Sequence, residues 1–217
     1  MKSKILNKLK YFLFEFIIVT LGILTAFSIN KWDENRKQET EEYLAYQSLK
    51  NDLESELYVY NYYKQPFIKS KNYISPILER NFEDVDSLMV YLNSSFDLQE
   101  RNATYINLKF SGNLEILKNN EIKNRVTLYY ETYYQALENM SSWNYDFRLH
   151  FLQPYLIKNL KYSSEEDLLE HLKKDEFLNI VNSQYQLMEY NISSIEKAEN
   201  LINKTIEEID RELNKDK

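Results

Sequence analysis

The sequence predicts an all-α protein, with one N-terminal transmembrane helix followed by an antiparallel helical-bundle soluble domain. Residues 11–29 form an unbroken, largely apolar stretch that spans roughly 28 Å as a helix, close to the thickness of a bilayer core. Only two glycines and three prolines occur in 217 residues, too few for the tight turns of a many-stranded β protein. We therefore divide the chain into a basic cytoplasmic segment (1–10), a transmembrane helix (11–30) and a soluble helical bundle (31–217).

Both ends of the apolar stretch carry residues typical of a membrane interface. Four lysines lie within the first ten residues, and Lys31 and Trp32 follow the stretch. Trp32 is therefore a predicted interface anchor beside a cation that can extend to the headgroups. The alternative is a cleavable secretory signal with Ala26-Phe27-Ser28 as its cleavage site, although this stretch is longer than a usual signal core.

Lysine and arginine decide the expected orientation, because acidic residues hardly affect the positive-inside rule. The far end of the stretch also has basic residues nearby, namely Lys31, Arg36, Lys37 and Lys50. The two ends therefore differ in how closely the basic residues are spaced rather than in their number. The denser N-terminal lysines predict a protein of the inner (cytoplasmic) membrane with a cytoplasmic N-terminus and a periplasmic or extracytoplasmic bundle.

Glu15 is an ionisable residue inside the predicted membrane helix. In a heptad frame it shares a face with Gly22 and Ala26, a small-xxx-small pair that lets two helices approach closely. This face predicts a helix–helix contact and a homo-oligomer. Two alternatives remain: Glu15 reaches headgroup water and complements the positive helix end, or it takes part in a proton or ion relay.

Beyond the anchor, apolar residues recur every three or four positions and predict three long helices. They cover residues 33–64, 120–152 and 175–213, and shorter helices cover 67–79, 85–92, 102–110 and a segment that begins with a capping box at Ser163. Pro66 is expected to begin a new helical segment, and Pro154 to mark a kink or a break. The first long helix should bury a stripe of Tyr and Leu residues, while its many acids, Glu56 among them, are interpreted as a solvated face.

The composition excludes several classes of chemistry. With a net charge of −7, and −10 once residues 1–30 are set aside, the bundle is a poor partner for nucleic-acid phosphates. The chain has no cysteine, and its two histidines lack metal-ligand spacing; His171 is expected to be exposed and His150 packed. We expect no catalytic residue, metal or cofactor, and hence no enzyme.

The densest polar-aromatic cluster in the sequence lies between residues 143 and 148. If it faces a groove, Trp143, Tyr145 and Arg148 would bind a small ligand or a peptide. The alternative is that these aromatic residues pack between helices and that Arg148 pairs with a carboxylate.

Two sets of motifs resemble a widespread bacterial family of small single-pass membrane proteins, a domain-of-unknown-function family. The first set comprises Glu15 to Val19, Gly22-Ile23-Leu24, Ala26, Ile29-Asn30, Trp32-Asp33-Glu34-Asn35, Tyr43-Leu44 and Asp52-Leu53. The second comprises Thr104-Tyr105, Leu108-Lys109, Ser111-Gly112, Leu114-Glu115 and Tyr129-Tyr130. Phe14 and Lys31 depart from the pattern, which has Gly and Asn there. The resemblance implies a topology and no activity.

Three functions fit these features. The first is a membrane-anchored helical interaction module that self-associates or binds an unknown protein partner. The second is an extracytoplasmic sensor or ligand-binding domain acting through a partner. The third is a single-pass component of an ion-driven membrane assembly that uses Glu15. The lipid bilayer is the one partner that all three share.

Overall fold

The computed structural model describes residues 2–94, 98, 101–161 and 164–215, with side chains from residue 12 onward. All regular structure in this part of the chain is helical, which confirms the predicted all-α class. The chain divides into two compact units, residues 1–45 and 46–217. Helix α1 (Lys2–Leu78) contributes residues to both units.

The first unit consists of the N-terminal part of α1, and its apolar side chains are exposed. Every residue from Phe12 to Val19 is exposed, and Phe27 is 66% exposed. No buried residue lies in the apolar window, whose mean hydropathy is 2.2. A helix that presents its apolar side chains on all sides is a candidate membrane span.

In the second unit α1 continues unbroken through Pro66 and Pro76 to Leu78. The predicted break at Pro66 is therefore wrong. Proline removes one helical hydrogen bond and crowds the preceding turn, but Phe67, Ile74 and Ile77 are buried on this part of α1. Packing of these side chains offsets the local cost of the proline.

Residues 79–119 connect two long helices and contain short elements. These are α2 (Leu88–Leu92), α3 (Ala103–Phe110) and the 3-10 turn η1 (Asn113–Ile116). Gly112 has a φ of 73°, so it closes α3 in the left-handed conformation expected for it. Asn119 then begins the next helix, because its side chain accepts hydrogen bonds from the N–H groups of Glu121 and Ile122.

The second long helix is a continuous run from Asn120 to Asn159 with two π-helical turns. It comprises α4 (Asn120–Leu128), η2 (Tyr129–Tyr134), α5 (Gln135–Phe147), η3 (Arg148–Leu152) and α6 (Gln153–Asn159). The predicted break at Pro154 does not occur. The wider turn of η3 directly precedes Pro154, and the Gln153 N–H bonds to the Arg148 carbonyl; a wide turn relieves the proline ring of its clash with the helix.

Helices α7 (Glu165–Leu172) and α8 (Asp175–Leu213) complete the bundle. Ser163, the predicted cap, lies outside the described residues; the Ser164 side chain caps α7 by accepting from the Asp167 N–H. Helix α8 ends where the periodicity predicted, and its buried apolar face includes Phe177, Val181 and Met188. That face also buries Gln184 and Asn191, which the apolar pattern did not include.

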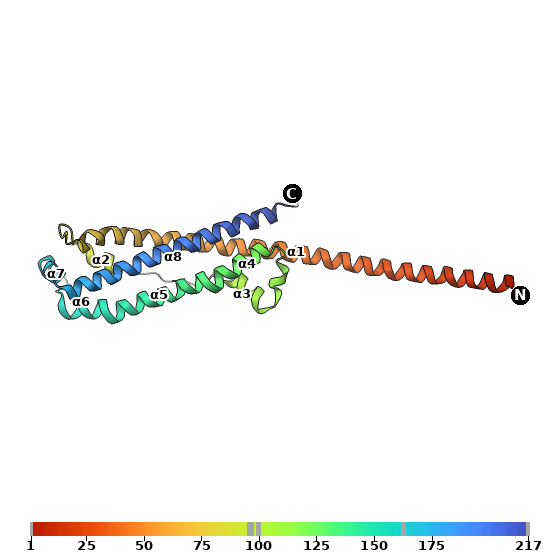
Figure 1. The fold of residues 1–217 in the computed structure, drawn as a ribbon, viewed down its shortest axis with the longest axis horizontal. Coiled ribbons are helices and arrows are strands. Elements are labelled where there is room, and N and C mark those ends of the chain that lie inside the picture. The colour runs from red at the N-terminus through yellow and green to blue at the C-terminus, as the bar shows by residue number, and fades with distance from the viewer. Residues whose placement is uncertain (1, 95–97, 99–100, 162–163, 216–217) are drawn as a thin grey trace. The chain divides into compact units, whose positions relative to one another are not determined.

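Side-chain pairs fix the directions of the long helices in the second unit. Lys50 pairs with Asp210, and Lys71 pairs with Glu189, so α8 runs antiparallel to α1. Hydrogen bonds from Asn119 to Glu208 and from Asn144 to Asn191 make α8 antiparallel to the α4–α6 run as well. Helix α8 lies along both neighbours (Figure 1). Because both neighbours run antiparallel to α8, they run parallel to each other.

Candidate functional site

Glu56 is the most unusual side chain in the bundle. It lies on α1, is 0% exposed, and neither carboxyl oxygen has a hydrogen-bond partner among the described residues. The neighbouring Leu53 and Tyr60 are also fully buried, because they share one face of the helix at spacings of three and four residues. The interpretation of Glu56 as part of a solvated acidic face was therefore wrong.

Tyrosines from α1, η2 and α3 pack together beside this carboxyl; we call Tyr60, Tyr105, Tyr129, Tyr130 and Tyr134 the tyrosine cluster. Tyr60, Tyr129 and Tyr130 are the members that interact electrostatically with Glu56. The hydroxyls of Tyr60 and Tyr129 are hydrogen-bonded at 2.6 Å. The Tyr105 and Tyr130 rings stack with centroids 4.7 Å apart, and the Tyr129 and Tyr134 rings meet edge to face. The hydroxyl of Tyr130 is buried without a hydrogen-bond partner in the described part of the chain.

The electrostatics of Glu56 follow from this apolar and phenolic environment. Burial raises the pKa of the Glu56 carboxyl to about 8; the charge of Arg101 acts in the opposite direction, and that of Asp52 adds to the rise. Burial also raises the pKa of the Tyr129 hydroxyl well above its ordinary value. The cluster therefore favours a neutral carboxylic acid among neutral phenols at pH 7.

The π-helical turn η2 explains how the second long helix brings three tyrosines to one place. Tyr129, Tyr130 and Tyr134 are all buried within this single turn. A π turn places more residues around the helix axis than an α turn, and such turns occur frequently at functional sites. Sequence reasoning identified Tyr129 and Tyr130 as apolar positions but selected Tyr133 instead of Tyr134. A 3.6-residue period gives no signal for the π turn or for Glu56 opposite it.

The second candidate site is an open groove of about 820 Å³ between the α5–η3 segment and α8. We call it the aromatic groove, and it is lined by Trp143, Phe147, Phe151, Asn179, Ile180, Asn182, Ser183, Gln186, Leu187 and Tyr190. Three of its rings are more than half exposed: Trp143 at 55%, Phe151 at 60% and Tyr190 at 52%. None of the lining residues is an acid or a base, which suits an apolar, uncharged occupant.

Of the three residues predicted to line a groove, the structure places one in the aromatic groove. Trp143 lines the aromatic groove, whereas Tyr145 is exposed outside its lining and Arg148 is half-buried outside it. Phe147 and Phe151, four residues apart in the helical run, stack with centroids 5.7 Å apart. The α8 side of the groove comes from residues that the polar-aromatic cluster in the sequence could not indicate.

In the first unit the predicted contact residues are all exposed. Glu15, Gly22 and Ala26 lie on α1 with open surroundings, and a side chain at Gly22 would meet no atom within 4 Å. The guanidinium of Arg36 lies 5.0 Å from the centroid of the Trp32 ring, which is a cation–π contact. The helix contact and the role of Trp32 as an interface anchor stay predictions.

The two histidines reverse their expected roles. His171 is buried, and its Nδ1 lies 2.8 Å from the Tyr155 hydroxyl, while His150 is exposed. The Tyr155 ring also stacks on Phe177, with centroids 4.9 Å apart. Sequence neighbours suggested the opposite, because charged residues flank His171 and Phe151 follows His150. Among the residues described, no group of three His, Asp or Glu side chains could hold a metal ion.

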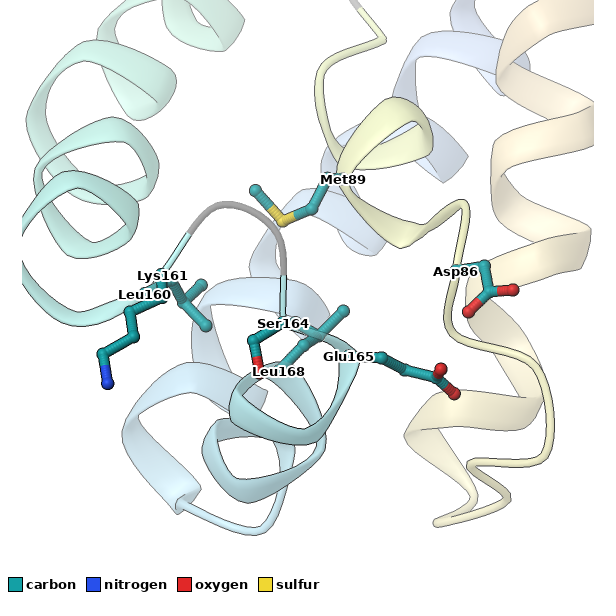
Figure 2. Close-up of a pocket in the computed structure, with 7 residues that line it drawn as sticks. All are labelled: Asp86, Met89, Leu160, Lys161, Ser164, Glu165 and Leu168. Carbon is teal, nitrogen blue, oxygen red and sulfur yellow. The ribbon is translucent and has the colours of Figure 1, made fainter.

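A smaller pocket of about 290 Å³ lies near the beginning of α7. Figure 2 shows the carboxyl groups of Asp86 and Glu165 on one side, and the Lys161 amine pointing away from them. Its Ser164 hydroxyl already accepts the Asp167 N–H as a helix cap. Because its charged groups do not converge and residues 162–163 between Lys161 and Ser164 are not described, we do not treat it as a functional site.

A candidate single membrane span joined to a helical bundle defines the structural class of this protein. The model of a family of unknown function, DUF6090, matches residues 15–153. The chain therefore belongs to that family. No curated protein and no solved structure matches it. The match spans Glu56 and the whole tyrosine cluster but ends before α8, so it includes only the α5–η3 side of the aromatic groove.

Proposed function

We propose that the protein is a non-enzymatic, membrane-anchored helical module that associates with a second copy of itself through the aromatic groove. The groove is the observation that supports this proposal. It gathers several exposed aromatic rings in one hollow of the helical bundle, and such patches typically mark binding surfaces. Aromatic residues also supply much of the binding energy in protein interfaces.

The charge distribution favours a second copy as the occupant. Two chains that each carry a net charge of −7 repel one another, and the repulsion is smallest where the meeting surfaces lack ionisable acids. The groove lining has none. Three of the rings that line the groove are more than half exposed, so the same surface on two chains can form a two-fold contact.

Residues 11–30 are the proposed membrane anchor, in the inner membrane with the N-terminus in the cytoplasm and the bundle on the outer side. The exposed apolar helix supports this assignment. Confinement of two anchors to one bilayer raises their effective concentration. The face formed by Glu15, Gly22 and Ala26 would add a helix contact within the membrane.

Cross-linking of the full chain in native membranes tests the proposal, because the chain has no native cysteine. Ser183→Cys places a thiol in the groove, and Asn203→Cys places one on an exposed position of α8 outside it. With a short bis-maleimide we expect a covalent dimer from Ser183→Cys and none from Asn203→Cys. Adding Trp143→Ala should reduce the Ser183→Cys dimer by about tenfold, the effect of losing about 1.4 kcal/mol of binding free energy.

Two results would contradict the proposal. One is a monomer at Ser183→Cys under conditions in which the thiol reacts fully with a mono-maleimide. The other is equal dimer yield from both cysteines, which would indicate random collision. A monomer whose tryptophan fluorescence saturates with an added uncharged lipid, in a Trp32→Phe background, would assign the groove to a small apolar ligand instead.

A further inference from the structure

Glu56 belongs to no part of the proposed interface, and its burial calls for a separate explanation. Its two oxygens have no hydrogen-bond partner in the described structure, and the residue is fully buried. A carboxylate in such a place has no hydrogen bond from the described residues to replace the water that it loses, whereas a protonated carboxyl avoids most of that penalty. The geometry therefore favours a bound proton.

The groups that face Glu56 come from three elements. On α1 they are Asp52 and Tyr60, on η2 they are Tyr129 and Tyr130, and before α3 there is Arg101. Tyr134, also on η2, interacts with Tyr60 and Tyr130. Arg101 is thus the cation that acts on the Glu56 carboxyl.

Other nearby charges are held in separate pairs. Helix α8 packs against η2, and its acids Asp210 and Glu199 pair with Lys50 and Lys64, on either side of Glu56 along α1. On η2, the carboxylate of Glu131 accepts hydrogen bonds from the Tyr105 hydroxyl and the Lys109 amine. These pairs leave Arg101 as the group best placed to respond to a charge on Glu56.

Arg101 is also connected to the position of α3. It is half-buried and directly precedes this helix, whose Thr104 N–H donates to the Asp52 carboxylate at 3.0 Å. The first turn of α3 is therefore attached to α1 one helical turn before Glu56. A shift of the Arg101 guanidinium towards α1 would move this turn with it.

We propose that Glu56 is a proton-binding site, and that release of its proton to solvent draws Arg101 and the first turn of α3 towards α1. The neutral acid suits the tyrosine cluster, whereas the carboxylate needs the guanidinium as a partner. The pKa of about 8 places this transition just above neutral pH. The bundle thereby acquires two states that differ by one proton.

Infrared spectroscopy of the full chain in detergent micelles tests the first half of the proposal. The C=O stretch of a protonated carboxylic acid should be present at pH 7 and disappear with a midpoint near pH 8, because burial raises the pKa of the Glu56 carboxyl to about 8. Glu56→Gln should remove this band. Glu54→Gln, which alters an exposed acid on the same helix, should leave both the band and its midpoint unchanged.

Spin-label distances test the second half. Labels on cysteines at Ser55 of α1 and Asn107 of α3, both exposed, should report a shorter distance above the infrared midpoint than below it. Glu56→Gln should hold the longer distance at every pH. Arg101→Gln should raise the infrared midpoint by removing the stabilising cation, and should abolish the distance change.

Three outcomes would overturn the proposal. Absence of a carboxylic acid band at pH 7 in the unaltered chain would show that Glu56 is ionised, and this result does not depend on the folding of any variant. A band that titrates without a distance change would exclude the coupling to α3. A distance change that persists in Glu56→Gln would assign the transition to another group.

Discussion

Two acids in the bundle, Glu56 and Glu199, have different surroundings although both lie at the interior of long helices. Glu199 on α8 forms an ion pair with Lys64 of α1, and their side chains are 12% and 15% exposed. Glu56 on α1 is fully buried and faces the tyrosine cluster. Glu199 thus faces a cation on the neighbouring helix, whereas Glu56 faces the phenol side chains of tyrosines.

The comparison shows that helix periodicity alone does not determine the state of an acid in this bundle. The Lys64 amine both neutralises Glu199 and donates a hydrogen bond to it, the arrangement in which a partly buried charge is tolerated. Tyr60 and Tyr129 bond to each other instead, which leaves Glu56 without a donor among the described residues. The side chain on the facing helix therefore decides whether the charged or the neutral form of the acid is stabilised.

The largest expected effect is on the pH dependence of stability. Burial raises the folded-state pKa of Glu56 to about 8 from its ordinary value of 4.5, so the folded state binds the proton more tightly than the unfolded state. The unfolding free energy should fall between about pH 4.5 and 8, by about 5 kcal/mol, and level off above that range. Urea unfolding of the full chain in micelles, followed by circular dichroism, measures this fall.

Glu56→Gln is the matched variant for that measurement. It should remove most of the fall, because the amide does not titrate over this range. If the variant and the unaltered chain lost the same free energy between pH 5 and 9, groups other than Glu56 would be responsible.

Lys64→Met should produce the next largest effect, because it leaves Glu199 largely buried without its cation. We expect a loss of about 2 kcal/mol, below the value for a fully buried pair because both side chains retain some exposure. A double-mutant cycle with Glu199→Leu measures the coupling. Additive losses in the cycle would show that the two side chains do not stabilise each other.

Tyr129→Phe removes one hydroxyl of the 2.6 Å pair and leaves Tyr60 buried without it. The expected loss is about 1 kcal/mol, the usual cost of a buried hydrogen bond whose partner remains. Chemical denaturation at pH 6 is the appropriate measurement, since Glu56 keeps its proton there. A loss above about 3 kcal/mol would contradict a simple hydrogen-bond role and would point to collapse of the cluster.

Glu54→Gln should have the smallest effect. Glu54 is exposed and lies 3.6 Å from the Lys50 amine, in an i, i+4 pair. Such surface pairs contribute about 0.5 kcal/mol or less, so the urea midpoint should barely change at any pH. A pH-dependent loss as large as that assigned to Glu56 would break the distinction between an exposed and a buried acid on α1.

The sequence predicted the elements whose signals are local. The apolar stretch, the end of α8 and the left-handed Gly112 all follow from composition, period or backbone preference. The breaks at Pro66 and Pro154 were wrong because packing in one case, and a π turn in the other, accommodate the proline. Local preference is a weak guide where tertiary contacts compensate for it.

The candidate sites were harder to predict because they depend on pairing between distant segments. Trp143 was found from its polar-aromatic neighbourhood, yet the α8 side of the groove has no such signature. In the sequence Glu56 is one of many acids on the first long helix. Its environment depends on the three tyrosines that η2 places against α1. A single sequence does not show which face of one helix meets which face of another.

The central proposal is that the N-terminal apolar helix anchors this helical bundle at the outer side of a membrane. The most direct test is labelling of Asn203→Cys, an exposed position on α8, with a membrane-impermeant maleimide in intact cells. The account predicts labelling before lysis and retention of the labelled chain in the membrane fraction after alkaline extraction. Labelling only after lysis, or release of the chain by extraction, would contradict it.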